Sequence, residues 1–156
     1  MDLMRKIKKI LTVISISVFF LMFNSCFKNS DKNDDSSFES LAKNTCIETG
    51  KTYKIKLRQN IKYDYDKLYI FEGPRFPSEI EEITNIKYND LLDDDYRLYL
   101  FVKNKVVIKQ EKSSSKDINV HRLMNEQGYV ILSPETILFT KKRKNGNDIY
   151  YDVFYK

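Results

Sequence analysis

Three side chains in the sequence have the intrinsic reactivity for nucleophilic or metal chemistry: Cys26, Cys46 and His121. A cysteine thiolate beside an imidazole forms a nucleophile–base pair, and histidine is a common zinc ligand. Neither Cys46 nor His121 lies in a CxxC pair or a metal-ligand spacing. We therefore predict no catalytic residue and no metal site, with His121 a surface or structurally satisfied histidine. Cys46 is expected to be a half-buried structural thiol, with a reactive thiol or a mixed disulfide as the alternatives.

The carboxylates and glycines add no selective pattern. Asp93, Asp94 and Asp95 are consecutive, so they lack the alternating spacing and closing glutamate of a calcium loop. The four glycines are isolated, and the chain contains neither GxGxxG nor GxxxxGK[ST], so no cofactor is predicted. Paired carboxylates hydrolyse glycosidic bonds in many enzymes, but nothing in the sequence selects one pair.

Basic residues form two candidate binding surfaces, one at a predicted hairpin tip and one alternating along a predicted strand. A concentrated cationic surface attracts anionic lipid, glycan or an acidic protein. The alternative is solvation alone, and Asp148 offsets part of the charge at the hairpin. If the two surfaces adjoin, they form one binding face. Its candidate residues are Lys54, Lys56, Arg58, Lys141, Lys142, Arg143 and Lys144.

Residues 1–25 have the organisation of an export signal. Met1–Lys9 is short and basic, Ile10–Phe23 is an apolar run of 14 residues, and the small Ser25 precedes Cys26. This order is that of a secretory signal peptide. As a helix the apolar run rises only about 21 Å, less than the roughly 30 Å of a bilayer's hydrocarbon core, which disfavours a permanent span.

The end of this signal, Met22-Phe23-Asn24-Ser25-Cys26, resembles the lipobox of bacterial lipoproteins. In that family a diacylglycerol is attached to the cysteine sulfur and the signal is cut just before it. The resemblance therefore implies lipidation of Cys26 and cleavage after Ser25. Phe23 stands where leucine is usual, and Asn24 is bulkier than usual. The alternatives are an ordinary cleaved signal and a retained helix.

The residues after the cysteine indicate a location and a tether. By the same resemblance, Phe27 in place of aspartate argues against retention in the inner membrane, so we expect the outer membrane. Lys28–Ser37 has no apolar residue and reaches at most about 35 Å, which predicts a polar tether. Its Asp31, Asp34 and Asp35 loosely resemble the surface-export signals of some outer-membrane lipoproteins, with a solvated linker as the alternative.

Charge and composition exclude one class of partner and favour strands. Residues 1–25 carry four basic residues and one acidic residue, so their removal lowers the net charge from +5 to +2. Nucleic-acid binding needs a concentrated basic footprint, and we predict no nucleic-acid partner. The eleven Tyr and ten Phe favour pleated, half-buried surfaces. About 119 residues remain to fold, enough for one core.

Sequence patterns predict the elements of this domain. Ser37 is expected to cap one short helix, and Ser78 with Glu81 the start of a second. Asn145-Gly146 predicts a two-residue hairpin turn, which would set Thr140 opposite Tyr151. We therefore predict a single small α+β domain, mainly an antiparallel sheet of six or seven strands with one or two short helices. The predicted strands are 52–58, 68–71, 96–102, 106–110, 129–132, 137–144 and 147–155, and residues 118–123 are ambiguous.

Part of the domain, Tyr65–Val107, also resembles small uncharacterised bacterial lipoproteins. The shared pattern is an aspartate (Asp66), an LYIF strand (Leu68–Phe71), a proline-bearing loop with an acidic helix start (Pro74–Glu82) and a strand LYLFVKNKVV (Leu98–Val107). This resemblance supports the fold and implies no activity.

The predicted organisation is a signal peptide (1–25), a lipid-anchored cysteine with its tether (26–37) and the α+β domain (38–156). The lack of a nucleophile–base set, metal cluster or cofactor loop favours a non-enzymatic binding or accessory module in the cell envelope, facing the periplasm or the cell surface. Its partners would be the membrane, through the lipid, and an unknown envelope protein or glycan. The alternatives are a hydrolase of envelope polymers and a purely structural protein. Two carboxylates about 5–10 Å apart in a deep cleft would favour the hydrolase, and a continuous sheet face the binder.

Overall fold

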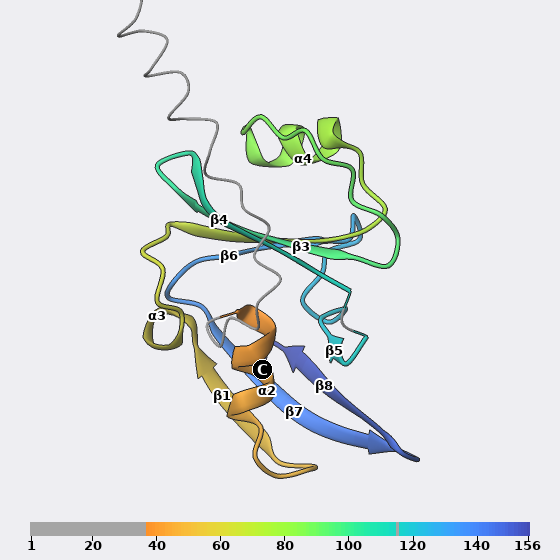
Figure 1. Cartoon of the computed structure of the whole chain (residues 1–156). Coiled ribbons are helices and arrows are strands. Elements are labelled where there is room, and N and C mark those ends of the chain that lie inside the picture. Colours follow the sequence, from red (N-terminus) through yellow and green to blue (C-terminus); the bar gives the residue numbers. More distant parts are fainter. Residues whose placement is uncertain (1–36, 115) are drawn as a thin grey trace, which may run out of the picture. The chain divides into compact units, whose positions relative to one another are not determined.

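The computed structural model describes residues 37–114 and 116–156, so the predicted signal peptide, Cys26 and the tether up to residue 36 lie outside the described residues (Figure 1). Three helices and eight strands within these described residues confirm the predicted α+β class. The helices are α2 (Phe38–Thr45), α3 (Leu57–Asn60) and α4 (Pro77–Thr84). The strands are β1 (Thr52–Lys56), β2 (Lys67–Glu72), β3 (Arg97–Lys103), β4 (Val106–Ser113), β5 (Ile118–Asn119), β6 (Tyr129–Leu132), β7 (Ile137–Asn145) and β8 (Asp148–Phe154).

The strands form two four-stranded sheets rather than one. Sheet A has the order β1-β7-β8-β5 and sheet B the order β4-β3-β2-β6. All neighbouring strands are antiparallel except β5 and β8, which are parallel. The extra strand is the two-residue β5, which comes from the segment that the sequence left ambiguous. It pairs with β8, a pairing between distant segments that no local pattern encodes.

Sheet B is covered on both faces, as the unbroken apolar runs of β2 and β3 require. In β2, Leu68 and Ile70 face the core shared with sheet A, while Tyr69 and Phe71 face the opposite side. That opposite side packs beneath α4, whose Ile80 is fully buried (Figure 1). The predicted central position of Leu68–Phe71 is therefore confirmed.

Helix α2 fills the space between the two sheets. It begins as predicted, because the Ser37 hydroxyl accepts a 3.0 Å hydrogen bond from the Ser40 amide. The Phe38 ring lies 5.3 Å from the ring of Tyr99 on sheet B. Just beyond the helix, Cys46 Sγ lies 3.3 Å from Thr140 Oγ1 on sheet A. Cys46 is 4% exposed, so the thiol is buried rather than half-buried.

The N-cap of α4 is Phe76, two residues before the predicted cap Ser78. Pro77 occupies the first turn, and the Glu79 carboxylate accepts a 2.7 Å hydrogen bond from the Phe76 amide. Glu81, the predicted capping partner of Ser78, instead accepts a hydrogen bond from the Tyr88 amide. Proline has no amide that needs a partner, and the Glu79 carboxylate satisfies the amide of Phe76, so this helix starts without a serine cap.

The last hairpin is present, but its register differs by two residues from the prediction. The turn residues are Gly146 and Asn147, so Thr140 lies opposite Val153 instead of Tyr151. Gly146 has a φ of 59°, whereas Asn147 is not among the residues with positive φ. A positive φ at only the first central position is the pattern of a type II′ turn, which requires glycine there. A shift of two residues leaves each side chain on its predicted face.

Candidate functional site

One face of sheet A brings together part of the predicted basic surface. In the antiparallel pairing of β1 with β7, Lys54 lies opposite Phe139 and Lys56 opposite Ile137. Their strand neighbours Ile55 and Leu138 are buried in the core between the sheets, so the lysines point to the other side. The two predicted surfaces therefore adjoin along these strands.

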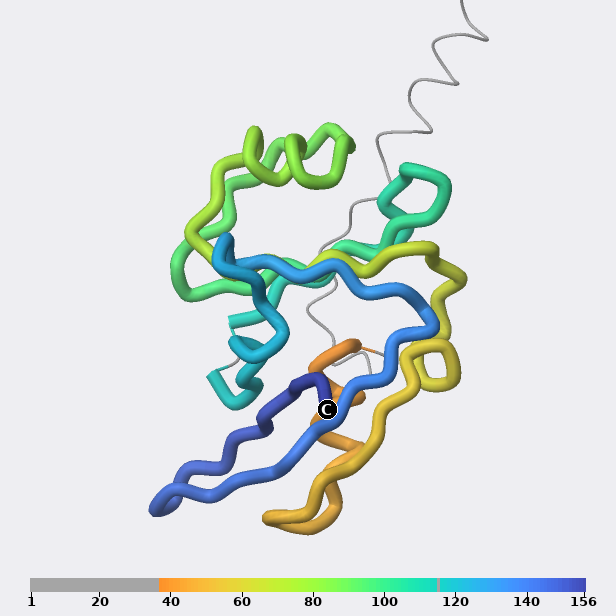
Figure 2. The backbone as a smooth tube through the Cα atoms, turned by 180° about the vertical axis from the view of Figure 1, so that it is seen from behind, coloured from red at the N-terminus to blue at the C-terminus, as the bar shows by residue number. Residues whose placement is uncertain are grey.

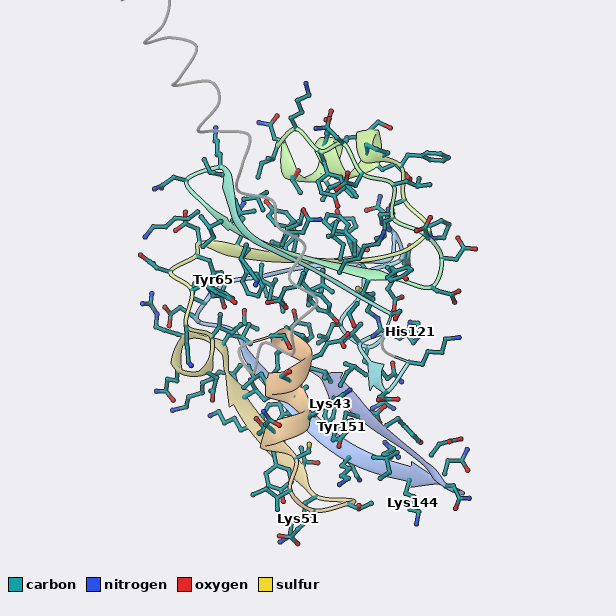
Figure 3. The ribbon with its side chains drawn as sticks, viewed as in Figure 1. Lys43, Lys51, Tyr65, His121, Lys144 and Tyr151 are labelled. Carbon is teal, nitrogen blue, oxygen red and sulfur yellow. The ribbon has the colours of Figure 1, made fainter. Side chains whose placement is uncertain are left out.

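Strand alternation divides the run of four basic residues on β7. Lys141 and Arg143 lie on the same face as Phe139, because successive side chains of a strand point to opposite sides. Lys142 and Lys144 lie on the other face, with the buried Thr140, and Lys142 is opposite Tyr151. In Figure 3, Lys144 is near the end of this hairpin.

Arg58 does not belong to this face. It lies in α3 instead of β1, and its Nε atom is 2.6 Å from Oε1 of Glu135. The clean alternation from Thr52 predicted that the strand would continue through Arg58. The strand ends at Lys56 because the Leu57 and Arg58 amides bond the carbonyls of Thr136 and Pro134 in the connection before β7.

An aromatic pair lies at the centre of the face, and sequence analysis did not identify it. The rings of Phe139 and Phe154, on paired positions of β7 and β8, are 6.3 Å apart. Lys156 Nζ lies 5.6 Å from the centre of the Phe139 ring, and Arg122 Cζ lies 5.9 Å from that of Phe154. These distances are those of cation–π contacts. The alternation of Phe139 with Lys141 and Arg143 was the available signal.

Positive charge dominates this face. Two acidic residues of β8 lie on this face by strand alternation. Asp152 is 5% exposed and is neutralised by Arg143, whose Nε donates to Oδ2, and the exposed Asp148 lies at the hairpin end, opposite Asn145. Lys54 and Lys141 form no ion pair with any described residue. No described helix covers the side of β1 and β7 that faces the viewer in Figure 2. We call this surface the basic face, made of Lys54, Lys56, Arg122, Ile137, Phe139, Lys141, Arg143, Phe154 and Lys156.

A second feature is a groove near β5, the end of the β7–β8 hairpin and the start of β3. It consists of two cavities of about 670 and 240 Å³. Arg97, Lys116 and His121 line both cavities, which are therefore adjacent (Figure 3 shows His121). None of the residues of the basic face lines either cavity. The groove approaches the basic face at the β7–β8 hairpin, where Tyr150, the residue opposite Arg143, lines the larger cavity.

An ion-pair network runs from this groove into the core. His121 Nδ1 lies 3.0 Å from Glu72 Oε2, and Arg97 Nε lies 3.2 Å from Glu72 Oε1. Arg97 Nη1 is also 3.7 Å from Glu39 Oε1, which accepts a 2.8 Å hydrogen bond from the Tyr99 hydroxyl. Burial raises the pKa of Tyr99 well above its usual value, and the neighbouring Glu39 carboxylate adds to the shift. The network therefore ties β2 and β3 of sheet B to α2 and to His121, which follows β5.

Glu72, which lines the groove, and the nearby Glu39 are both held by internal contacts. A glycosidase requires one protonated carboxyl group and one free carboxylate on either side of the substrate. Glu39 is 8% exposed, and its second oxygen accepts a hydrogen bond from the Ser113 hydroxyl. Glu72 uses both oxygens on Arg97 and His121. Both carboxylates therefore hold neighbouring side chains in place.

The two reactive residues that the structure describes, Cys46 and His121, do not meet. Cys46 contacts Thr140 and His121 contacts Glu72, and no contact joins the thiol to the imidazole within residues 37–114 and 116–156. Across the same residues, no group of three or more His, Cys, Asp or Glu side chains is placed to hold a metal ion. The consecutive residues 93–95 lie in a turn region, where Asp93 and Asp95 approach Lys112 and Lys116.

None of the helices in the described part of the chain has the length and apolar character needed to traverse a bilayer. No protein-family model, curated protein or solved structure matches the chain.

Proposed function

We propose that the chain is a lipid-anchored protein of the bacterial cell envelope whose domain binds an anionic partner through the basic face, without catalysing a reaction. The lipobox-like sequence before Cys26 supports the anchor. The resemblance of that sequence also supports an outer-membrane location. The basic face supports the binding role.

The observation that carries the binding role is the concentration of unneutralised charge on one open sheet face. The described residues carry 21 basic and 18 acidic side chains, a net charge of +3. The basic face has six basic side chains and two acidic ones: Asp152, which is buried and neutralises Arg143, and Asp148 at the hairpin end. The remaining surface is therefore close to neutral or slightly acidic. Such a difference attracts an anionic partner to one side of the domain.

Lipid anchoring is tested by growing cells with radiolabelled palmitate. The chain should incorporate label and fractionate with membranes, and the variant Cys26→Ser should incorporate none. Two or more acyl chains on one residue anchor a protein stably, which explains the expected fractionation. A wild-type chain that is unlabelled and freely soluble would refute the anchor.

The binding role is tested with two double variants that make the same charge change. Lys54→Glu with Lys141→Glu alters the basic face, and Lys142→Glu with Lys144→Glu alters the opposite face of the same sheet. On an immobilised polyanion such as heparin, the first variant should elute at much lower salt than the second. Equal elution of the two variants would show that net charge alone governs retention.

A further inference from the structure

We infer that the basic face rests on the anionic phospholipid headgroups of the bilayer that holds the chain's own lipid anchor. This inference rests on the proposed function and names the partner of the same face. Its basis is the spread of cations over three strands, the apolar centre of the face and the short tether.

The cations are distributed over an area instead of converging on a point. Lys54 lies on β1, Lys141 on β7, and Arg122 approaches Phe154 on β8. Neighbouring strands are about 4.8 Å apart, so the charges span about two strand spacings, from β1 to β8. A site for one small anion requires side chains that converge on it. An array of separate phosphates at a membrane surface matches the observed spread.

The centre of the face suits the boundary between headgroups and acyl chains. Phe139 and Phe154 are partly exposed, and Ile137 beside them is 42% exposed. Lysine and arginine chains lie along apolar surface while their charged ends remain in the polar layer. Lys156 and Arg122 are placed in this way over the two rings. Apolar residues ringed by cations are typical of surfaces that bind anionic membranes.

The tether keeps the basic face close to the bilayer. Between Cys26 and the helix cap Ser37 the chain reaches at most about 40 Å. A short tether gives the second contact a high effective concentration, so a weak face is sufficient for a stable docked state. Each lysine or arginine near an anionic surface strengthens binding roughly fivefold. The unpaired cations of the face are thus enough for tethered docking.

The test uses the mature chain from residue 26 with Cys26→Ser, so that the face acts without its lipid. The described residues form a compact unit with a core between the sheets, so this chain folds without residues 1–25. Cosedimentation is measured with vesicles of phosphatidylcholine and phosphatidylglycerol, and with vesicles of phosphatidylcholine alone. We expect binding only to the first, with loss at high salt.

The double variants described above localise the contact. Lys54→Glu with Lys141→Glu should weaken vesicle binding about 25-fold or more, since two favourable charges are removed. Lys142→Glu with Lys144→Glu should weaken it by only a few-fold. Circular dichroism and thermal unfolding check that both variants are folded. Adding inorganic phosphate at the same ionic strength as sodium chloride should have no greater effect than the chloride.

Several results would overturn the inference. These are no binding to anionic vesicles, equal binding to neutral vesicles, equal weakening by the two double variants, or specific competition by inorganic phosphate. If the face binds heparin but no vesicles, the membrane partner is wrong while the proposed anionic-binding role stands. Palmitate labelling tests the lipid anchor separately. Failure of the anchor, of anionic binding and of membrane docking can therefore be distinguished.

Discussion

The hydroxyl of Tyr99 donates a 2.8 Å hydrogen bond to Oε1 of Glu39, and both residues are buried where α2 meets sheet B. Tyr99→Phe should therefore lower the free energy of unfolding by about 1–3 kcal/mol, because a buried carboxylate loses a donor. Urea denaturation followed by circular dichroism measures the change. An unchanged midpoint would mean that another donor replaces the hydroxyl.

Removing the tyrosine hydroxyl should have a different effect on stability at Tyr65. Its hydroxyl is buried without a hydrogen-bond partner among the described residues. Tyr65→Phe should leave stability unchanged or raise it by up to about 1 kcal/mol, because it removes an unsatisfied polar group. The two variants belong in one denaturation series. Equal destabilisation by both would contradict the assigned contacts.

Stability should decline at alkaline pH because of the buried tyrosines. Burial raises the pKa of Tyr65 and of Tyr88 to about 12, above the usual value of 10.0. Above pH 10 the unfolded chain releases these protons while the folded chain keeps them, so unfolding becomes more favourable as pH rises. The loss should run from about pH 10 to pH 12. Urea midpoints across this range check it, and Tyr65→Phe should reduce the slope.

Removing the cation that both carboxylates share should be costly. Arg97→Met leaves the nearly buried Glu39 and the partly buried Glu72 without their guanidinium. Breaking a buried ion pair by deleting one partner costs about 3–5 kcal/mol, and we expect a loss near the lower end. Arg97→Lys keeps the positive charge but lacks the planar guanidinium that contacts both carboxylates. The stability of this variant should therefore be intermediate. Denaturant midpoints of the three proteins give the order.

The turn between β3 and β4 offers a stabilising substitution. Asn104 and Lys105 both have positive φ, 50° and 63°, as in a type I′ turn. Lysine in this conformation is strained by roughly 1 kcal/mol, whereas glycine is not. Lys105→Gly should raise the free energy of unfolding by about 0.5–1 kcal/mol. Lys103→Gly, which lies in β3, is the control and should lower it.

Local signals in the sequence predicted most of the elements. The Ser37 cap depends on one hydrogen bond, to the amide of the residue three positions later in the chain. The apolar run Leu68–Phe71 required cover on both faces of its strand. The outward position of Lys54 and Lys56 follows from strict alternation with Ile55. Each of these features is determined within one element, so the sequence pattern carries it.

Features that depend on distant residues were not predicted. Glu39 on α2 meets Arg97 on β3, which is paired with Glu72 on β2, and nothing in their local sequence marks them. The division into two sheets likewise arises from long-range pairing, as between β1 and β7. The basic face was predicted in part, because strand alternation alone determines which basic residues of β7 lie on the same side. Arg122 lies outside the strands and joins the face by contacting the Phe154 ring on β8. Lys156 follows the end of β8 and joins the face by contacting the Phe139 ring on β7.

The position of α2 between the sheets determines how the domain would carry a mechanical load. Any pull on the chain upstream of Ser37 is transmitted to Phe38, which is 1% exposed and packed on Tyr99. Such a force acts on the packed interface between the sheets. It does not act on an edge strand, whose hydrogen bonds would break one at a time. The buried aromatic contact and the Glu39–Arg97 ion pair would therefore resist the force together.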